Sequence, residues 1–323
     1  MKNGIGMRER GGQRIRYIEF GANKTKVSEV VLGMMRIWEK TPDEVADLIE
    51  CGLDCGINAV DTAPIYGPSE GKLGEAFVAR LGLRDRVWLQ TKLGIRSHPR
   101  VKANCFDFSY EHIMESVDNS LRALQTDHVD SLLLHRPDAL MVPEDIARAF
   151  EELHAAGKVL DFGVSNQNPA MMSRLAHYLP FPIAANQVQI SAAFTPMFDA
   201  FFNANMENDA AVMRDGGILE YCSDHHMAVQ AWSVLQHGYF GGVFLDNPDY
   251  AELNEALERI AADHDTTKTA VAINWVLRYP AKMQALVGTT RQERIRQSAA
   301  ACDWEMTREE WYEVYLSAGH QLP

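Results

Sequence analysis

The sequence predicts a single-domain α/β protein, a (β/α)8 TIM barrel in which a helix follows each of eight parallel strands. Short apolar runs alternate with amphipathic helical patterns eight times along the 323 residues. Strict alternation of this kind indicates parallel strands joined by helical crossovers, and eight repeats favour closure into a barrel. No GxGxxG motif follows any predicted strand, which weighs against an open dinucleotide-binding sheet.

The first unit shows the signals on which the assignment depends. Residues 27–33 form a short apolar run, which predicts a strand. Residues 41–44 (TPDE) then supply a helix start, because Thr is a preferred N-cap, Pro fits the first turn and Glu completes a capping box. Apolar residues at helical spacing follow, and Gly56 marks the helix end.

The other seven units repeat this plan. Their strands are predicted at residues 58–61, 87–91, 129–134, 161–164, 183–189, 228–232 and 284–287. Their helices are predicted at about residues 71–80 and 110–124, around an apolar face of Ile146, Ala149, Phe150 and Leu153, near 170–178 and 218–223, as more than one helix between 250 and 279, and at 291–301.

Composition limits the classes of partner. A hydrophobic fraction of 46% suffices for a large core, and a net charge of −13 argues against nucleic acid as a partner. The five cysteines form no CxxC pair or metal set, so we expect reduced thiols, no metal and a cytoplasmic location. No apolar stretch is long enough for a membrane, and we expect a monomer. Residues 1–15, basic and Gly-rich, are expected to be a disordered tail, with a weak transit peptide as the alternative, and residues 16–323 to form the barrel.

Ionisable residues lie at the ends of three neighbouring strands. Asp61 ends the second strand and Tyr66 follows it, Lys92 ends the third strand, and His135 follows the fourth. The active site of such barrels lies at the C-terminal ends of the strands, so these four side chains should meet at one mouth. The simpler alternative is a structural ion pair beside a tyrosine, with a histidine at the rim.

This set of residues suits proton transfer to a carbonyl oxygen. A tyrosine with a pKa near 10 is a weak acid at neutral pH, and a buried Lys92 ammonium should lower the pKa of Tyr66. A shift of about two units corresponds to roughly 2.7 kcal/mol. Asp61 can keep Lys92 charged, and His135 can orient the substrate oxygen or relay the proton. Tyr66 is therefore the predicted general acid.

Eight motifs carry a resemblance to a known family. In chain order they are VDTAPIYG, SEGKLGEAF, LQTKLG, LLLHRPD, GVSN, NQVQIS, AWSVL and VGTTRQERI. Together they resemble the aldo-keto reductase family, in particular its bacterial oxidoreductase branch, from about Arg16 to Ala301. The resemblance implies a catalytic tetrad of Asp61, Tyr66, Lys92 and His135. It also implies that NADPH reduces an aldehyde or ketone to an alcohol.

The resemblance further implies a set of cofactor contacts. They comprise the first-strand loop, the carboxamide and ring contacts of the nicotinamide, the pyrophosphate stretch and the adenosine-phosphate site. In that order the residues are Gly33, Met34, Ser165, Asn166, Gln187, Trp232, Ser233, Leu235, Gly288, Thr289, Thr290, Arg294, Gln297 and Ser298. Trp38 and Arg96 are candidate substrate contacts on loops after the first and third strands.

The adenosine-phosphate site is also predicted from the residues themselves. Thr290 and Glu293 have capping-box spacing, so a helix N-terminus, which binds phosphate, is expected there. Arg291 and Arg294 add positive charge that can pair with a 2′-phosphate, which favours NADPH over NADH. Gly288 departs from the family pattern, since many relatives have Lys there, and this weakens the expected preference.

Two questions remain open at the level of sequence. Residues 191–217 form a long aromatic-rich connection that either packs against the barrel or covers the substrate. Two other functions compete with carbonyl reduction: a Schiff-base lyase with Lys92 as nucleophile, and a non-catalytic NADPH-binding module. The substrate is expected to be a small carbonyl or alcohol, and its identity is not predicted.

Overall fold

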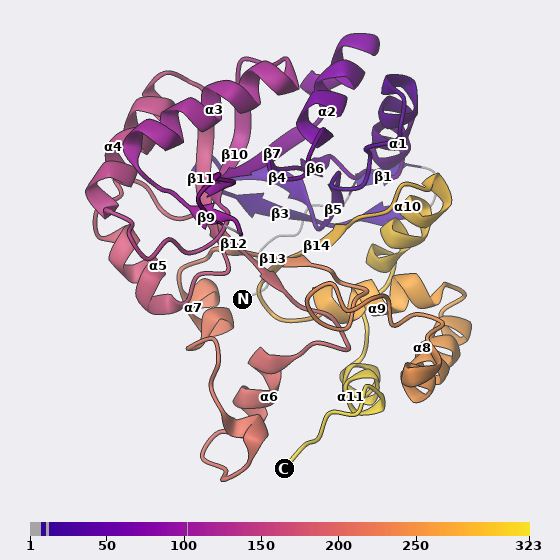
Figure 1. Cartoon of the computed structure of the whole chain (residues 1–323). Coiled ribbons are helices and arrows are strands. Elements are labelled where there is room, and N and C mark those ends of the chain that lie inside the picture. Colours follow the sequence, from indigo (N-terminus) through magenta and orange to yellow (C-terminus); the bar gives the residue numbers. More distant parts are fainter. Residues whose placement is uncertain (1–7, 11–12, 102) are drawn as a thin grey trace.

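Eight parallel strands form a closed barrel in the computed structural model, which describes residues 8–10, 13–101 and 103–323. The barrel strands are β5 (Val30–Gly33), β6 (Ala59–Asp61), β7 (Trp88–Leu93), β10 (Val129–Leu134), β11 (Val159–Ser165), β12 (Ala185–Gln189), β13 (Ala228–Trp232) and β14 (Lys282–Val287). They pair in chain order, and β14 closes the ring by pairing with β5. The predicted eight-stranded barrel in a single domain is confirmed (Figure 1).

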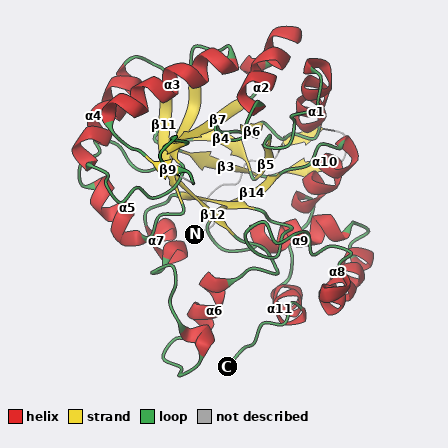
Figure 2. Ribbon diagram, in the orientation of Figure 1, coloured by secondary structure: helices red, strands yellow, loops and turns green. Residues whose placement is uncertain are grey.

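Helices surround the strands (Figure 2). Those that follow the barrel strands are α1 (Pro42–Asp54), α2 (Ser69–Ala79), α3 (Tyr110–Leu124), α4 (Pro143–Ala155), α5 (Pro169–Ala176), α7 (Ile218–Asp224), α8 (Ala251–Asp263), α9 (Lys268–Leu277) and α10 (Gln292–Ala299). The predicted start of α1 is confirmed, because Thr41 Oγ1 accepts a hydrogen bond from the Glu44 amide and the Glu44 carboxylate accepts one from the Thr41 amide.

The N-terminal segment departs from the predicted single strand at residues 27–33. That run divides into β5 and a separate strand, β4 (Thr25–Ser28), which pairs antiparallel with β3 (Tyr17–Phe20). Apolar residues of this hairpin, including Ile18, Phe20 and Val27, share a buried cluster with residues from seven of the barrel strands. The hairpin therefore covers the N-terminal end of the barrel, opposite the predicted site.

The expected tail at residues 1–15 lies partly outside the described residues. Within it, β1 (Arg8–Arg10) pairs antiparallel with β2 (Gln13–Ile15), and Ile15 is buried in the main core. A second short hairpin, β8 (Ile95–Arg96) with β9 (Cys105–Phe106), follows β7 at the other end of the barrel.

The long connection at residues 191–217 packs in part against the C-terminal helix. It contains α6 (Pro196–Phe202), and α11 (Arg308–Ser317) lies beside it (Figure 1). The Phe198 ring lies in edge contact with Trp275 and Trp311, and the Tyr315 hydroxyl donates a hydrogen bond of 2.7 Å to Asp199. The first half of residues 191–217 therefore packs against the rest of the protein. This favours packing over covering the substrate as the role of that half.

The close approach of α2 and α3 fixes one wall of the site. A Cβ added at Gly74 would lie 2.2 Å from the Ala123 carbonyl oxygen. We expect Gly74→Ala to lower the free energy of unfolding by about 1–3 kcal/mol, because two backbones must separate. Gly71→Ala on the same helix is the control, since no heavy atom lies within 4 Å of its added Cβ; it should be neutral or stabilising. Urea unfolding of both variants measures the difference, and equal effects would contradict the contact.

Candidate active site

Asp61 and Lys92 form a buried ion pair inside the barrel. They lie at the C-terminal ends of the adjacent strands β6 and β7, and Lys92 Nζ lies 2.6 Å from Asp61 Oδ1. The ammonium also donates to the Thr62 carbonyl at 2.9 Å and to the Tyr66 hydroxyl at 3.3 Å. The Lys92 side chain has no solvent exposure. Its ammonium group therefore interacts with these three groups and not with water.

Tyr66 and His135 complete the cluster. The turn after β6 carries Tyr66, whose amide donates to the Ala63 carbonyl, while the His135 amide donates to the Leu93 carbonyl on β7. Tyr66 Oη lies 3.5 Å from His135 Nε2, and the two rings are nearly perpendicular at 86°. The structure therefore brings together all four residues that the sequence singles out for catalysis.

The ionisation of the cluster differs from the expectation in one respect. Burial raises the pKa of the Tyr66 hydroxyl by more than the Lys92 charge lowers it, so the predicted net lowering is wrong in this structure. Burial opposes the charge on Lys92, but Asp61 and Tyr66 together hold the pKa of Lys92 above its ordinary value. Burial and the Lys92 charge place the pKa of His135 well below 6.5. At neutral pH the cluster therefore has a protonated tyrosine, an ammonium and a neutral imidazole.

The residues expected at the nicotinamide are connected to one another. Trp232 Nε1 donates to Asn166 Oδ1 at 3.3 Å, and Asn166 Nδ2 donates to Ser165 Oγ at 2.7 Å. The Ser165 hydroxyl donates to the Gln187 carbonyl, and Gln187 Nε2 donates to Asp61 Oδ2 at 3.0 Å. A continuous set of hydrogen bonds thus joins the expected nicotinamide site to the Asp61 carboxylate.

Two of the expected cofactor residues have unusual backbone conformations. Asn166 and Ser233 both have a φ of 55°, in the left-handed region that side chains other than glycine seldom adopt. Such strain costs on the order of 1 kcal/mol or more and is concentrated at functional sites. Ser233 Oγ donates to Gln236 Oε1 at 2.7 Å, which holds the turn after β13.

The predicted adenosine-phosphate site lies at the start of α10. The predicted capping box of Thr290 and Glu293 is wrong, because the helix has Arg291 as N-cap and no side-chain cap. Thr289 Oγ1 accepts a hydrogen bond from the Arg291 amide in the link before the helix. Gly288, Thr289 and Thr290 form the exposed or half-buried link between β14 and this helix, and Arg294 is exposed on it.

Sequence analysis missed an arginine beside this link. Arg36, in the loop after β5, is exposed, and its Nη1 lies 4.0 Å from the position of a Cβ added at Gly288. Its position could have indicated this, because Arg36 follows Met34 by two residues and so lies on the expected ribose loop. The exposed Arg36 guanidinium therefore lies beside Gly288 on this link.

The remaining predicted residues have varied environments. Met34 is buried, and its backbone bridges Asp61 and Ser69. Gly33, Leu235 and Gln297 are half-buried, Ser298 is buried with its hydroxyl bonded to the Arg294 carbonyl, and Trp38 is exposed. Arg96 forms an ion pair of 2.5 Å with Asp107, so its charge is already matched within the protein.

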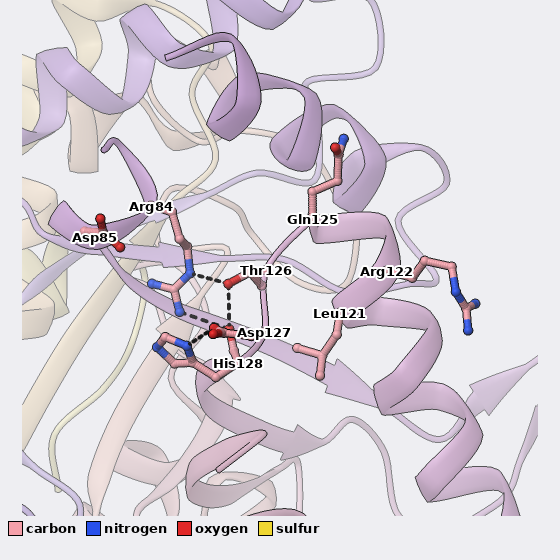
Figure 3. A pocket seen from close by; sticks show the side chains of 8 residues that line it. All are labelled: Arg84, Asp85, Leu121, Arg122, Gln125, Thr126, Asp127 and His128. Atoms are coloured by element: carbon pink, nitrogen blue, oxygen red, sulfur yellow. Dashed lines mark hydrogen bonds and ion pairs between the residues drawn. The ribbon is translucent and has the colours of Figure 1, made fainter. Parts of the chain in front are cut away.

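Two hollows lie at opposite ends of the barrel. One, of about 280 Å³, is lined by Lys92 and His135 together with residues of α2 and α3. The other, of about 580 Å³, is lined by residues that precede β7 and β10, including Arg84 and Asp127 (Figure 3). Arg84 is bonded there to Thr126, to Asp130 and to backbone carbonyls. The larger hollow therefore holds a structural ion pair at the end away from the tetrad.

The comparisons with known proteins decide the family. A sequence model described as Aldo/keto reductase family matches residues 29–315. This chain belongs to the aldo/keto reductase family. It is 37% identical to a 6-dehydroglucose reductase of Agrobacterium fabrum, covering 92% of this chain and 96% of that protein. It is 34% identical to the oxidoreductase YdhF of Escherichia coli, covering 92% and 95%.

Solved structures agree with this assignment. An aldo-keto reductase from Klebsiella pneumoniae in complex with NADPH has a TM-score of 0.71 and 25% identity, covering 95% of each chain. Aldo/keto reductases are oxidoreductases that act on small molecules, so the family assignment makes this chain an enzyme of that class. Among its described residues, no helix is long and apolar enough to cross a membrane.

Proposed function

We propose that this protein reduces an aldehyde or ketone to an alcohol with NADPH, with Tyr66 as the general acid. The observation that carries the proposal is the position of the Tyr66 hydroxyl, 3.3 Å from a fully buried ammonium and 3.5 Å from a neutral imidazole. A proton donor beside a fixed positive charge is what a developing alkoxide requires.

The chain's own residues supply the proton and hold it in place. NADPH, when bound, supplies the hydride that reaches the carbonyl carbon. Tyr66 Oη gives its proton to the carbonyl oxygen as the C–H bond forms, and the resulting phenolate is stabilised by Lys92 Nζ. Neutral His135 donates a hydrogen bond that orients the carbonyl oxygen. Solvent returns a proton to Tyr66 after the alcohol leaves, so the reaction consumes one hydride and one proton.

The described residues fit a nicotinamide cofactor. Trp232 presents an indole ring beside Asn166, and both strained residues, Asn166 and Ser233, border the same mouth. The nicotinamide carboxamide would be held by Ser165, Asn166 and Gln187. The ribose and pyrophosphate would be held by the first-strand loop together with Ser233 and Leu235. The α10 link with Arg294, Gln297 and Ser298 would hold the adenosine phosphate. Trp38, which is exposed, would contact substrate at the mouth; Arg96 would do so only through its pair with Asp107.

The Schiff-base alternative is disfavoured by the ion pair. A nucleophilic lysine needs a neutral amine, whereas Asp61 at 2.6 Å and the Tyr66 hydroxyl hold the pKa of Lys92 above its ordinary value. The five cysteines are free thiols in the described structure, which suits the cytoplasmic location that we propose. We also propose that the enzyme acts as a monomer.

A substrate panel tests the proposed reaction. Purified protein is mixed with NADPH or NADH and a set of carbonyls, and absorbance at 340 nm is followed. The set includes 4-nitrobenzaldehyde, short ketones and sugar aldehydes, because two relatives are named 6-dehydroglucose reductase. We expect NADPH oxidation with at least one aldehyde. Tight NADPH binding without turnover across the panel would instead support the non-catalytic module.

Arg36 and Arg294 should set the preference for NADPH. We expect either arginine-to-alanine variant to raise the KM for NADPH about tenfold or more and to leave the KM for NADH unchanged, because only NADPH has the 2′-phosphate. Arg308→Ala on α11 removes the same charge from an exposed position and serves as control. Steady-state kinetics with each cofactor measures the ratio, and a parallel rise for both cofactors would contradict this role.

A further inference from the structure

Four glutamines fill the barrel interior below the tetrad. Gln90, Gln187, Gln230 and Gln284 project from β7, β12, β13 and β14, and none is more than 2% exposed. Gln187 and Gln230 are register partners on adjacent strands, as are Gln230 and Gln284. Barrel interiors are usually filled by branched apolar side chains, so four buried amides need a specific reason.

Hydrogen bonds fix the orientation of each of these amides. The Ser28 carbonyl can only accept, and Gln284 Nε2 donates to it at 2.9 Å. Gln284 Oε1 then accepts from Gln230 Nε2 at 3.0 Å. Gln230 Oε1 in turn accepts from Gln90 Nε2 at 2.9 Å and from Gln187 Nε2 at 3.1 Å. Gln230 Nε2 also donates to Gln90 Oε1 at 3.1 Å, so these two amides pair with each other. Reversing any one amide would place like groups together, so the backbone carbonyl fixes the orientation of the whole chain.

The chain ends with two N–H donors on one carboxylate oxygen. Gln90 Nε2 lies 2.7 Å and Gln187 Nε2 3.0 Å from Asp61 Oδ2. The other oxygen, Oδ1, accepts from Lys92 Nζ. Both oxygens of Asp61 are therefore committed, and the carboxylate cannot rotate without losing hydrogen bonds in a buried site, where an unmade bond is costly.

We propose that Gln90, oriented by Gln230, is a positioning residue that acts through Asp61. It holds Asp61 Oδ2, so that Oδ1 stays aimed at Lys92 and the ammonium stays within reach of the Tyr66 hydroxyl. Gln187 connects the network to the expected cofactor site. It is the residue expected to contact the nicotinamide carboxamide, and its Nε2 donates to the same oxygen of Asp61. This inference rests on the proposed function.

Gln90→Met tests the proposal. Methionine has a similar volume but no donor, so we expect kcat with 4-nitrobenzaldehyde to fall about tenfold to hundredfold while the KM for NADPH stays unchanged. The effect should fall on kcat alone, because Gln90 reaches the reacting groups through Asp61. A purely structural role would lower the melting temperature and leave the kcat of the folded enzyme at the wild-type value.

Gln284→Met is the matched control. It removes the same amide from the same interior but leaves both donors on Asp61. We expect a similar loss of thermal stability with kcat at the wild-type value. If Gln90→Met does not fold, Gln230→Met replaces it, because it frees both donors to turn and should also lower kcat.

The outcomes separate this inference from the proposed function. If the Gln90 and Gln284 variants lower kcat alike, the network is packing only and the inference is overturned. The same holds if Gln90→Met matches wild type while Tyr66→Phe is inactive. Full turnover by Tyr66→Phe would overturn the proposed function itself.

Discussion

Tyr66→Phe should lower the turnover of carbonyl reduction about a hundredfold to ten-thousandfold, the usual contribution of a positioned general acid. The substitution removes one hydroxyl, which lies 3.3 Å from Lys92 Nζ and 3.5 Å from His135 Nε2, and keeps the ring that also packs against both side chains. The ring is half-buried and should keep its place. Single-turnover measurement with saturating NADPH isolates the chemical step from cofactor binding.

Cofactor binding is the control for this variant. Trp232 lies in the expected nicotinamide site and is connected to Asn166 rather than to Tyr66. NADPH should therefore quench tryptophan fluorescence in Tyr66→Phe as it does in the wild type. Retained turnover with a confirmed substrate would show that another group supplies the proton. Lost binding would show that the ring has a structural role.

The dependence on pH follows from the same residue. Reduction needs the protonated tyrosine, and burial raises the pKa of Tyr66 above its ordinary value of 10.0. The reductive kcat should thus hold through the neutral range and fall only in strong base. Alcohol oxidation needs the phenolate, so its rate should rise with pH over the same range.

The fold could be predicted because its signals are local and repeated. Three elements have the predicted bounds: the helix at residues 110–124 and the strands at 129–134 and 228–232. Their signals, alternation and helical spacing, depend only on residues that are close in the sequence. The hairpin formed by β3 and β4 was missed because β3 was not recognised as a strand and the end of β4 was read as part of the apolar run at residues 27–33. The helices α6 and α11 were missed because they are stabilised by contacts with each other and with α9.

The site could be predicted in part for a similar reason. Asp61, Lys92 and His135 stand at strand ends, which barrel geometry brings to one mouth. The Tyr66 pKa was misjudged because sequence shows the neighbouring charge but not the degree of burial. Gln90 and Gln230 were missed because they contact each other across the barrel, 140 residues apart in the chain.

Lys92→Met should have the largest combined effect on stability and activity. It leaves Asp61 charged and buried without its cation, which typically costs about 3–5 kcal/mol. The two amide donors on Asp61 Oδ2 should keep the loss toward the lower end of that range. Turnover should fall at least as far as in Tyr66→Phe, because the Tyr66 phenolate loses its stabilising charge. Chemical unfolding and single-turnover kinetics on the same preparation measure both effects.

The double variant Asp61→Asn/Lys92→Met separates the two roles of this pair. Both charges are absent, so no unpaired ion remains, and replacing a buried pair by neutral groups is often close to neutral in stability. We expect the double variant to be more stable than either single variant and to remain inactive. A double-mutant cycle gives the coupling energy. Recovery of turnover together with stability would mean that Lys92 serves the fold alone, because a catalytic charge cannot be restored by removing its partner.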